Sequence, residues 1–219
     1  EPPPYTRPLN VTGRTIVCIS PVRTEPGIVA LRVSLNGQQF FETGIDFQYY
    51  ANPNLTAIHP RGGLVTGATP VTIYGTGFRN FEPNVPVSRC SWGFGPDGTR
   101  LTTAARYDAS LYHAPSNSTG AMVCLSYLRA RGGLAADTVA LSLSINGVDF
   151  IAEPTAAQPY KFYVQPALFQ GVYPTGGPIS GGTVMTFEGR GFANFDGNPS
   201  TARCSWGNVQ TNAATLTIP

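Results

Sequence analysis

Hydrophobic and polar residues alternate along several short stretches of this chain, and this alternation predicts β-strands. Residues 140–145 read Ala-Leu-Ser-Leu-Ser-Ile, which is the pattern of a strand with one buried face. The runs at 71–74 and 184–187 are short, rich in β-forming residues and bounded by glycines. No stretch keeps a helical period. The pattern therefore predicts an all-β protein with about seven short strands per hundred residues, which is the size of a two-sheet sandwich.

One ordered set of motifs occurs twice in the chain. Residues 58–93 contain Pro-x-Gly-Gly, then Gly-x-Gly-Phe-x-Asn-Phe, then Cys-Ser-Trp-Gly, and residues 172–207 repeat all three in the same order. Gly75 recurs as Gly189 and Cys90 as Cys204, both 114 positions later. A fixed period of this length predicts tandem copies of one domain.

A second repeated block lies outside the first. Val-Cys-x-Ser, followed by Leu-x-x-Ser-x-Asn-Gly, occurs in residues 17–37 and again in 123–147, at offsets of 106 and 110. Each block ends on an Asn-Gly pair, which is a hairpin-turn signal because both central positions of that turn favour positive φ. The blocks divide the chain into the back half of one repeat (1–50), a complete repeat (51–164) and the front half of another (165–219).

The ordered motifs resemble those of the IPT/TIG domains, which are immunoglobulin-like modules of plexins, Met-type receptors, fibrocystin-like proteins and some transcription factors. The resemblance rests on features that occur in order along the whole chain: Pro60 and Pro174, Gly181-Gly182, the two Gly-x-Gly-Phe motifs, the two Arg-Cys-x-Trp-Gly motifs, and Cys18-x-Ser-Pro21. It implies a tandem array of immunoglobulin-like (IPT/TIG) β-sandwiches. Ala68 in place of the later Gly182, and Tyr127 in place of the earlier Pro21, are departures that concern local turns.

The four cysteines allow three interpretations from the residues alone: buried free thiols, a zinc site or disulfides. The Cys-x-x-Cys pairs typical of zinc sites are absent. The family resemblance implies that Cys90 pairs with Cys124, which leaves Cys18 and Cys204 with partners outside this chain. A Cys18–Cys204 bond is an alternative that requires the first and third repeats to touch. Four small buried apolar residues without bonds remain the other alternative.

Three sequons make N-linked glycosylation a further expectation, at Asn10, Asn54 and Asn117. The Asn198-Pro-Ser segment is excluded by its proline. Asn10 and Asn117 both lie in Asn-x-Thr-Gly segments just before the second cysteine of a repeat, 107 positions apart. Glycans and disulfides occur together in the secretory pathway, so we expect an extracellular or cell-surface protein.

The charge content argues against nucleic acid and anionic membranes as partners. Charged residues make up 12% of the chain, the net charge is +2, and the basic residues, with Lys161 as the single lysine, are scattered. Binding to nucleic acid usually needs a basic patch or stripe. No apolar run is long enough to span a bilayer, so we expect contact with a membrane only through parts of the protein absent from this chain.

The sequence offers little for catalysis, and we expect neither an enzyme nor a cofactor. Its two histidines are His59, which the next repeat replaces with Tyr173, and His113 in an expected loop. Asp97 and Asp108 lie between the repeat motifs and could be neighbours. The Gly-x-Gly-Phe motif lies between strands, so it indicates a turn or bulge rather than a phosphate loop.

The aromatic residues have a structural and a binding interpretation. We expect Trp92 and Trp206 to pack against disulfides in the sandwich cores, as a tryptophan does in related folds. Tyr107, Tyr112 and Tyr160 could instead form surface contacts with a partner.

Three functions follow, in order of preference. The first is a non-catalytic structural or adhesive repeat array of a cell-surface or filament-forming glycoprotein, whose partners are other proteins or copies of itself. The second is the stem of a plexin-like, Met-like or fibrocystin-like receptor ectodomain. The third is a DNA-binding transcription-factor domain, which the scattered arginines, the sequons and the cysteine pattern oppose.

Overall fold

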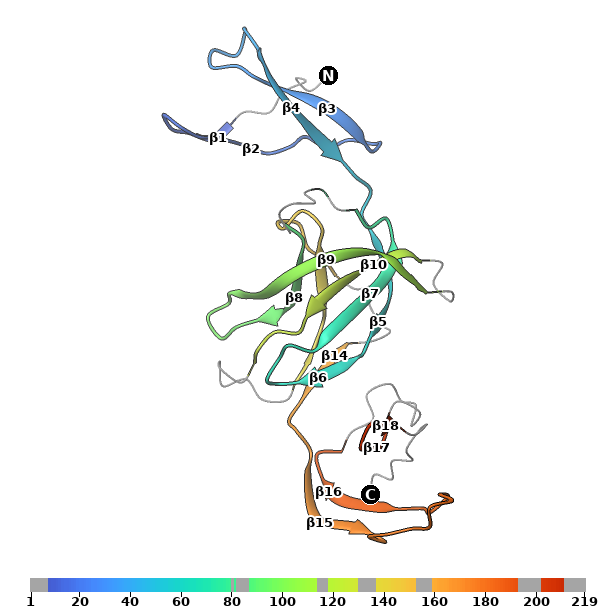
Figure 1. The fold of residues 1–219 in the computed structure, drawn as a ribbon. Helices are drawn as coiled ribbons and strands as arrows, with labels where there is room; N and C mark the ends of the chain where they lie inside the picture. Colours follow the sequence, from blue (N-terminus) through green and yellow to red (C-terminus); the bar gives the residue numbers. More distant parts are fainter. Residues whose placement is uncertain are drawn as a thin grey trace. The chain divides into compact units, whose positions relative to one another are not determined.

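The chain is described by a computed structural model (Figure 1). It describes residues 8–79, 81, 87–113, 118–129, 137–152, 159–192 and 202–210. Every regular element in these ranges is a β-strand, so the fold is all-β. The chain divides into two compact units, Glu1–Asn52 and Pro53–Pro219. The expected repeat boundaries at 50/51 and 164/165 stay predictions.

The described residues of the predicted complete repeat, 51–164, contain ten strands. They are β5 (Asn54–His59), β6 (Gly62–Leu64), β7 (Pro70–Thr76), β8 (Arg89–Phe94), β9 (Arg100–His113), β10 (Ser118–Leu125), β11 (Thr138–Val139), β12 (Ser142–Ser144), β13 (Ile151–Ala152) and β14 (Tyr160–Tyr163). One layer has the order β5-β7-β10-β9. The other contains β6-β14-β11 and β13-β12-β8, which meet because β11 and β12 are separated by only two residues.

The long strand β9 takes part in both layers. Its first residues pair with β8, from Arg89 opposite Ala104 to Phe94 opposite Arg100. From Ala105 onward it pairs with β10. In Figure 1, β5, β7, β10 and β9 run side by side, and β9 continues past β8. The two layers are therefore joined through one continuous strand.

The core lies between the layers and follows the alternation of the sequence. In β7, Val71, Ile73 and Gly75 are buried, whereas Thr72 and Tyr74 between them are not fully covered. β10 lies beside β7 in the same layer and adds Met122 and Cys124 to this buried face. The largest fully buried side chains elsewhere in the repeat include Leu55, Trp92, Leu141, Leu143, Ile145, Tyr160 and Phe162.

Two local expectations from the sequence hold only in part. The strand expected at 140–145 is present but shorter, since β12 covers Ser142–Ser144, and its apolar residues Leu141, Leu143 and Ile145 are buried as the alternation predicts. Both Asn-Gly pairs lie in hairpins between antiparallel strands, as expected, but they do not form tight two-residue turns. Gly37 and Gly147 have positive φ, but Asn36 and Asn146 do not, and each loop between strands is wider.

The asparagines of these loops act instead through their side chains. The Asn146 Oδ1 atom accepts hydrogen bonds from the backbone N–H groups of Val148 (3.0 Å) and Asp149 (2.9 Å). The Asn36 Oδ1 atom accepts from Gln38 (3.0 Å) and Gln39 (2.9 Å) in the same way. The repeated Asn-Gly therefore marks one loop structure present in both repeats.

The remaining strands form pairs rather than closed sandwiches. In the first unit, β1 (Pro8–Val11) pairs with β2 (Ile16–Cys18), and β3 (Gly27–Val33) pairs with β4 (Phe41–Tyr49). In the last part of the chain, β15 (Ala167–Tyr173) pairs with β16 (Thr186–Arg190), and β17 (Ser205–Trp206) pairs with β18 (Val209–Gln210).

Candidate functional site

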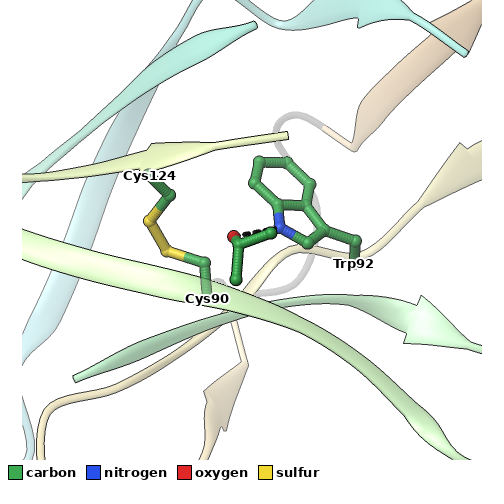
Figure 2. Close-up of a disulfide and its surroundings, with 4 residues drawn as sticks. Cys90, Trp92 and Cys124 are labelled. Atoms are coloured by element: carbon green, nitrogen blue, oxygen red, sulfur yellow. Dashed lines mark hydrogen bonds between the residues drawn. A yellow bond between two sulfur atoms is a disulfide. The ribbon is translucent and has the colours of Figure 1, made fainter. Parts of the chain in front are cut away.

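A disulfide joins the two layers of the complete repeat. Cys90 on β8 and Cys124 on β10 are bonded, with their Cα atoms 6.4 Å apart, and both are buried (Figure 2). Because β8 and β10 belong to opposite layers, the bond fixes one layer against the other. It closes a segment with a sequence separation of 34, and loop-closure entropy gives it about 3 to 4 kcal/mol of stabilisation.

Trp92 fills the core on the same face of β8 as Cys90. Figure 2 shows its indole turned to the interior near the disulfide, and the side chain is fully buried. The indole N–H donates to Thr103 Oγ1 at 2.8 Å, which satisfies its one polar atom. Its ring meets Tyr160 and Phe162 edge-on, with centroids 4.9 and 6.1 Å away. The structure thus confirms the expectation that Trp92 lies in the core.

Arg129 is a buried charge beside this aromatic cluster. One guanidinium nitrogen donates to the Trp92 carbonyl at 3.3 Å, and another pairs with the Asp137 carboxylate at 3.2 Å. The guanidinium carbon lies 4.9 Å from the centre of the Phe162 ring. Because the guanidinium group is planar, it can stack on the Phe162 ring and donate hydrogen bonds at the same time. Arg129 therefore ties the segment after β10 to strands β8 and β14.

Tyr160 is buried, which corrects the idea that it lies on a surface for partners. Burial raises the pKa of its phenol. The phenol oxygen lies so close to Gly63 that a Cβ on this glycine would collide with it. Tyr107 is half-buried with its ring over Gly120, and the Tyr112 side chain lies outside the described residues.

The Gly-x-Gly-Phe motif forms the same local structure in both repeats. A Cβ on Gly75 would collide with the Asn54 carbonyl and lie 2.8 Å from the Phe78 ring. Gly77 has φ +79° and faces Pro53. In the later repeat, Gly189 faces Ala167 and Phe192, and Gly191 has φ +80° and faces Pro166. The motif is a close-packed turn that holds the phenylalanine and the proline before each repeat's first strand.

Cysteines 18 and 204 lie in the two incomplete repeats. Cys18 is exposed and Cys204 is half-buried. Trp206 is exposed, contrary to expectation. The strands that bring Tyr160, Phe162 and Leu143 over Trp92 are β12 and β14, whereas the strands described in residues 165–219 are β15 to β18, which follow the order of β5, β7, β8 and β9. The pairing of Cys18 and Cys204 with partners beyond this chain stays a prediction.

Two of the three sequons can be placed in the structure. Asn10 lies on β1 and Asn54 opens β5, which is an edge strand of its sheet, and both residues are exposed. Asn117 lies outside the described residues. Glycosylation of all three stays a prediction.

The candidate acid residues do not form a site. Asp97 accepts from the Thr99 hydroxyl at 2.8 Å, and Asp108 accepts from the Ser110 hydroxyl at 2.6 Å. These hydrogen bonds lower the pKa of both carboxyls, as do the neighbouring backbone N–H groups of Thr99 and Ser110. Asp97 precedes β9 and Asp108 lies well along it, so the extended chain separates them by roughly 20 Å or more.

Within the described ranges, the histidines, the possible metal ligands and the apolar segments also form no recognisable site. His59 is exposed, and the side chain of His113 is not described. Among the residues that the structure describes, no three His, Cys, Asp or Glu side chains gather so that they could hold a metal ion. In the same part of the chain, no helix is long and apolar enough to cross a membrane.

Sequence reasoning missed Arg129 and the core position of Tyr160. Arg129 lies five positions after Cys124, as Arg23 lies five positions after Cys18, so the arginine is part of the second repeated block. The arginine shortly after the second cysteine of the repeat was the available signal, but the sequence does not show that its side chain is buried.

Comparison with known proteins finds one family model that matches part of the chain. The family model of the IPT/TIG domain matches residues 167–218. None of the curated proteins compared with this chain matches it. Among solved structures, the plexin A4 full extracellular region, domains 1 to 10, is similar at 14% identity and a TM-score of 0.44, covering 91% of this chain. The chain spans 16% of the length of that structure's chain.

Proposed function

The chain carries an IPT/TIG domain sequence in residues 167–218, and since residues 51–164 contain the same ordered motifs, we propose that it is a load-bearing segment of an extracellular repeat array. Its work is to space, display or assemble other parts of a cell-surface or filament-forming glycoprotein. It catalyses no reaction in this role. Its partners are other proteins or copies of itself, and it carries N-linked glycans.

The observation that carries this proposal is the cross-layer disulfide. Two sheets that are bonded through Cys90 and Cys124 resist shearing past each other, because the bond must break before the layers separate fully. Disulfides of this kind persist in oxidising compartments, which supports an extracellular location. A spacer needs this resistance, whereas a DNA-binding domain in a reducing compartment would not retain the bond.

Short connections between the repeats support the same function. Four residues separate β4 from β5, and three separate β14 from β15. In each connection a proline, Pro53 or Pro166, lies against the second glycine of the Gly-x-Gly-Phe motif. A connection that is short and packed against the following repeat has little freedom to act as a long flexible linker.

Stretching single molecules of the full chain tests the proposal. We expect the complete repeat to unfold in one abrupt event under oxidising conditions. In the double variant Cys90→Ala/Cys124→Ala, the same event should release roughly 11 nm more chain, since the 34 residues locked by the bond extend at about 3.3 to 3.6 Å each.

The double variant is the matched control, because it changes only the bond that the proposal depends on. Gradual extension of the oxidised protein at negligible force, without a defined event, would contradict a load-bearing role. A receptor stem is the second candidate function. A transmembrane helix and a cytoplasmic signalling domain in the full protein would favour it over a filament.

A further inference from the structure

The loop between β12 and β13 holds the Asn146 side chain through both of its polar atoms. The Oδ1 atom accepts from the Ser144 hydroxyl at 3.0 Å and from the backbone N–H groups of Val148 and Asp149 at 3.0 and 2.9 Å. The Nδ2 atom donates to Asp149 Oδ2 at 2.8 Å. Three donors thus converge on one carbonyl oxygen, while the amide nitrogen faces a carboxylate.

Gly147 follows this asparagine directly, and only Asn36 is followed by a glycine elsewhere in the chain. A glycine has no Cβ, so its backbone nitrogen is the least hindered in approaching the side-chain carbon of the residue before it. Gly147 has φ +81°, and a Cβ on it would lie 2.7 Å from the Val87 carbonyl oxygen. The loop therefore keeps an accessible nitrogen next to a polarised amide carbon, and such proximity favours reaction within the chain.

The reaction that this arrangement favours is ring closure followed by hydrolysis. The Gly147 backbone nitrogen loses its proton to solvent and bonds to Asn146 Cγ, which places negative charge on Oδ1, where the three donors already point. The bond from Cγ to Nδ2 then breaks, and this nitrogen takes a proton from solvent and leaves as ammonia. Water opens the cyclic imide at one of its two carbonyls and gives aspartate or isoaspartate. No oxidant or reductant takes part.

We propose that Asn146 is a site of spontaneous deamidation and that its conversion weakens the complete repeat. In the aspartate product, a carboxylate oxygen replaces the Nδ2 atom that donates to Asp149. Neither carboxylate can donate to the other, and like charges repel at this distance. The modification depends on this loop alone and not on whether the repeat bears load.

The loop is attached to the strand that carries the disulfide, so damage to it reaches the core. The hydroxyl of Ser88, just before β8, is buried and donates to the Ile145 carbonyl at 3.0 Å. Ser144, the last residue of β12, lies opposite Arg89, the first residue of β8. Loosening of the loop therefore acts on the end of the β8–β12 ladder, next to Cys90.

The first repeat contains the same loop with a different partner for the amide. The Asn36 Oδ1 atom accepts from the Ser34 hydroxyl at 3.1 Å and from the backbone N–H groups of Gln38 and Gln39. The Nδ2 atom of Asn36 donates to the Gln39 side-chain oxygen. Because an amide can turn over, Gln39 can donate to a carboxylate formed at position 36. The two loops thus share the reactive arrangement and differ in what conversion does to them.

Ageing the full chain in mildly alkaline buffer tests the reaction. The buffer is made with water enriched in heavy oxygen, so that peptide mass mapping identifies each asparagine that has been hydrolysed. The same chain held unfolded in urea supplies the reference rate, and we expect the folded protein to convert Asn146 at a comparable rate. An Asn146 amide that persists in the folded protein, while it is lost from the unfolded chain, overturns the proposal.

Substitutions in the two loops test the effect on stability. Asn146→Asp reproduces the product, and we expect it to lower the Tm of the complete repeat by about 4 °C or more, which corresponds to one lost hydrogen bond. Asp149→Asn keeps an acceptor oxygen and should leave the Tm nearly unchanged. In the double variant Asn146→Asp/Asp149→Asn, the new amide donates to the new carboxylate, so the Tm should return close to that of the unaltered chain. Asn36→Asp is the matched control and should leave the Tm unchanged.

The double variant separates the proposed repulsion from a general intolerance of the loop to change. An unaltered Tm in Asn146→Asp overturns the proposal, and so does a double variant that is no more stable than Asn146→Asp alone. The stretching experiment uses freshly prepared chains with intact amides, so neither result affects it.

Discussion

The turn before β7 contains two neighbouring residues in the left-handed region, and only one of them is a glycine. Gly67 has φ +74° and Ala68 has φ +61°, where the later repeat has Gly181 and Gly182 at φ +75° and +81°. An alanine in this region costs about 1 to 2 kcal/mol. Ala68 thus adopts the same turn conformation as the later Gly182, and the free energy of unfolding is lower for it.

The two positions should respond differently to substitution. A Cβ on Gly67 would lie 2.8 Å from the backbone of Leu128, so Gly67→Ala must shift main-chain atoms as well as adopt a positive φ. We expect it to lower the free energy of unfolding by about 2 kcal/mol or more. Ala68→Gly should leave it unchanged or raise it by up to about 1 kcal/mol, since relief of strain exceeds the added freedom of the unfolded chain. Urea denaturation of the complete repeat measures both, and equal effects would contradict this account.

At the scale of elements, the segment after β10 is held in place more by the buried contacts of Arg129 than by its ion pair with Asp137. The partner Asp137 is half exposed, with 58% of its side chain accessible, so water screens their attraction. The hydrogen bond to the Trp92 carbonyl and the stacking on Phe162 are buried and are not screened in this way.

Substitutions on the two sides of this ion pair separate the contributions. Arg129→Lys keeps the charge but loses the planar group, and we expect a loss of about 1 to 3 kcal/mol in the free energy of unfolding. Asp137→Asn should cost less than about 1 kcal/mol. Thermal unfolding of both variants measures the two losses of stability. A larger effect at Asp137 would mean that the ion pair, rather than the stacking, holds the segment.

The elements also show where sequence reasoning succeeds and where it stops. The β-rich run at 71–74 and the repeated glycines predicted β7 and the turns beside it correctly, because these features depend on neighbours along the chain. The break between β11 and β12 could not be predicted, because it arises from hydrogen bonds to strands far away in the sequence. Burial of Tyr160 and Arg129 is likewise decided by packing between the layers.

For the molecule as a whole, the all-β fold followed from the ordered motifs, and the IPT/TIG family model matches the copy of these motifs in residues 167–218. The exposure of Trp206 did not, because its motif indicates a core position whether or not the covering strands are present.

The expected compartment can be tested on the whole secreted chain. We expect its intact mass to fall on enzymatic removal of N-glycans, with modified peptides containing Asn10, Asn54 and Asn117. Peptides containing Cys90 and Cys124 should be linked before reduction. Substitution of each asparagine by glutamine in turn is the matched control and should remove one glycan each time. Bare asparagines together with unlinked cysteines would overturn the extracellular assignment.

The position of the disulfide in the sequence also has a consequence for synthesis. The ribosome makes the chain from its N-terminus, and both Cys90 and Cys124 precede β11, β12 and β14. The two sulfur atoms can therefore enter an oxidising compartment before the strands that finish the second layer have been made. An oxidised hairpin of β9 and β10, already attached to β8, would then serve as the template onto which the later strands fold.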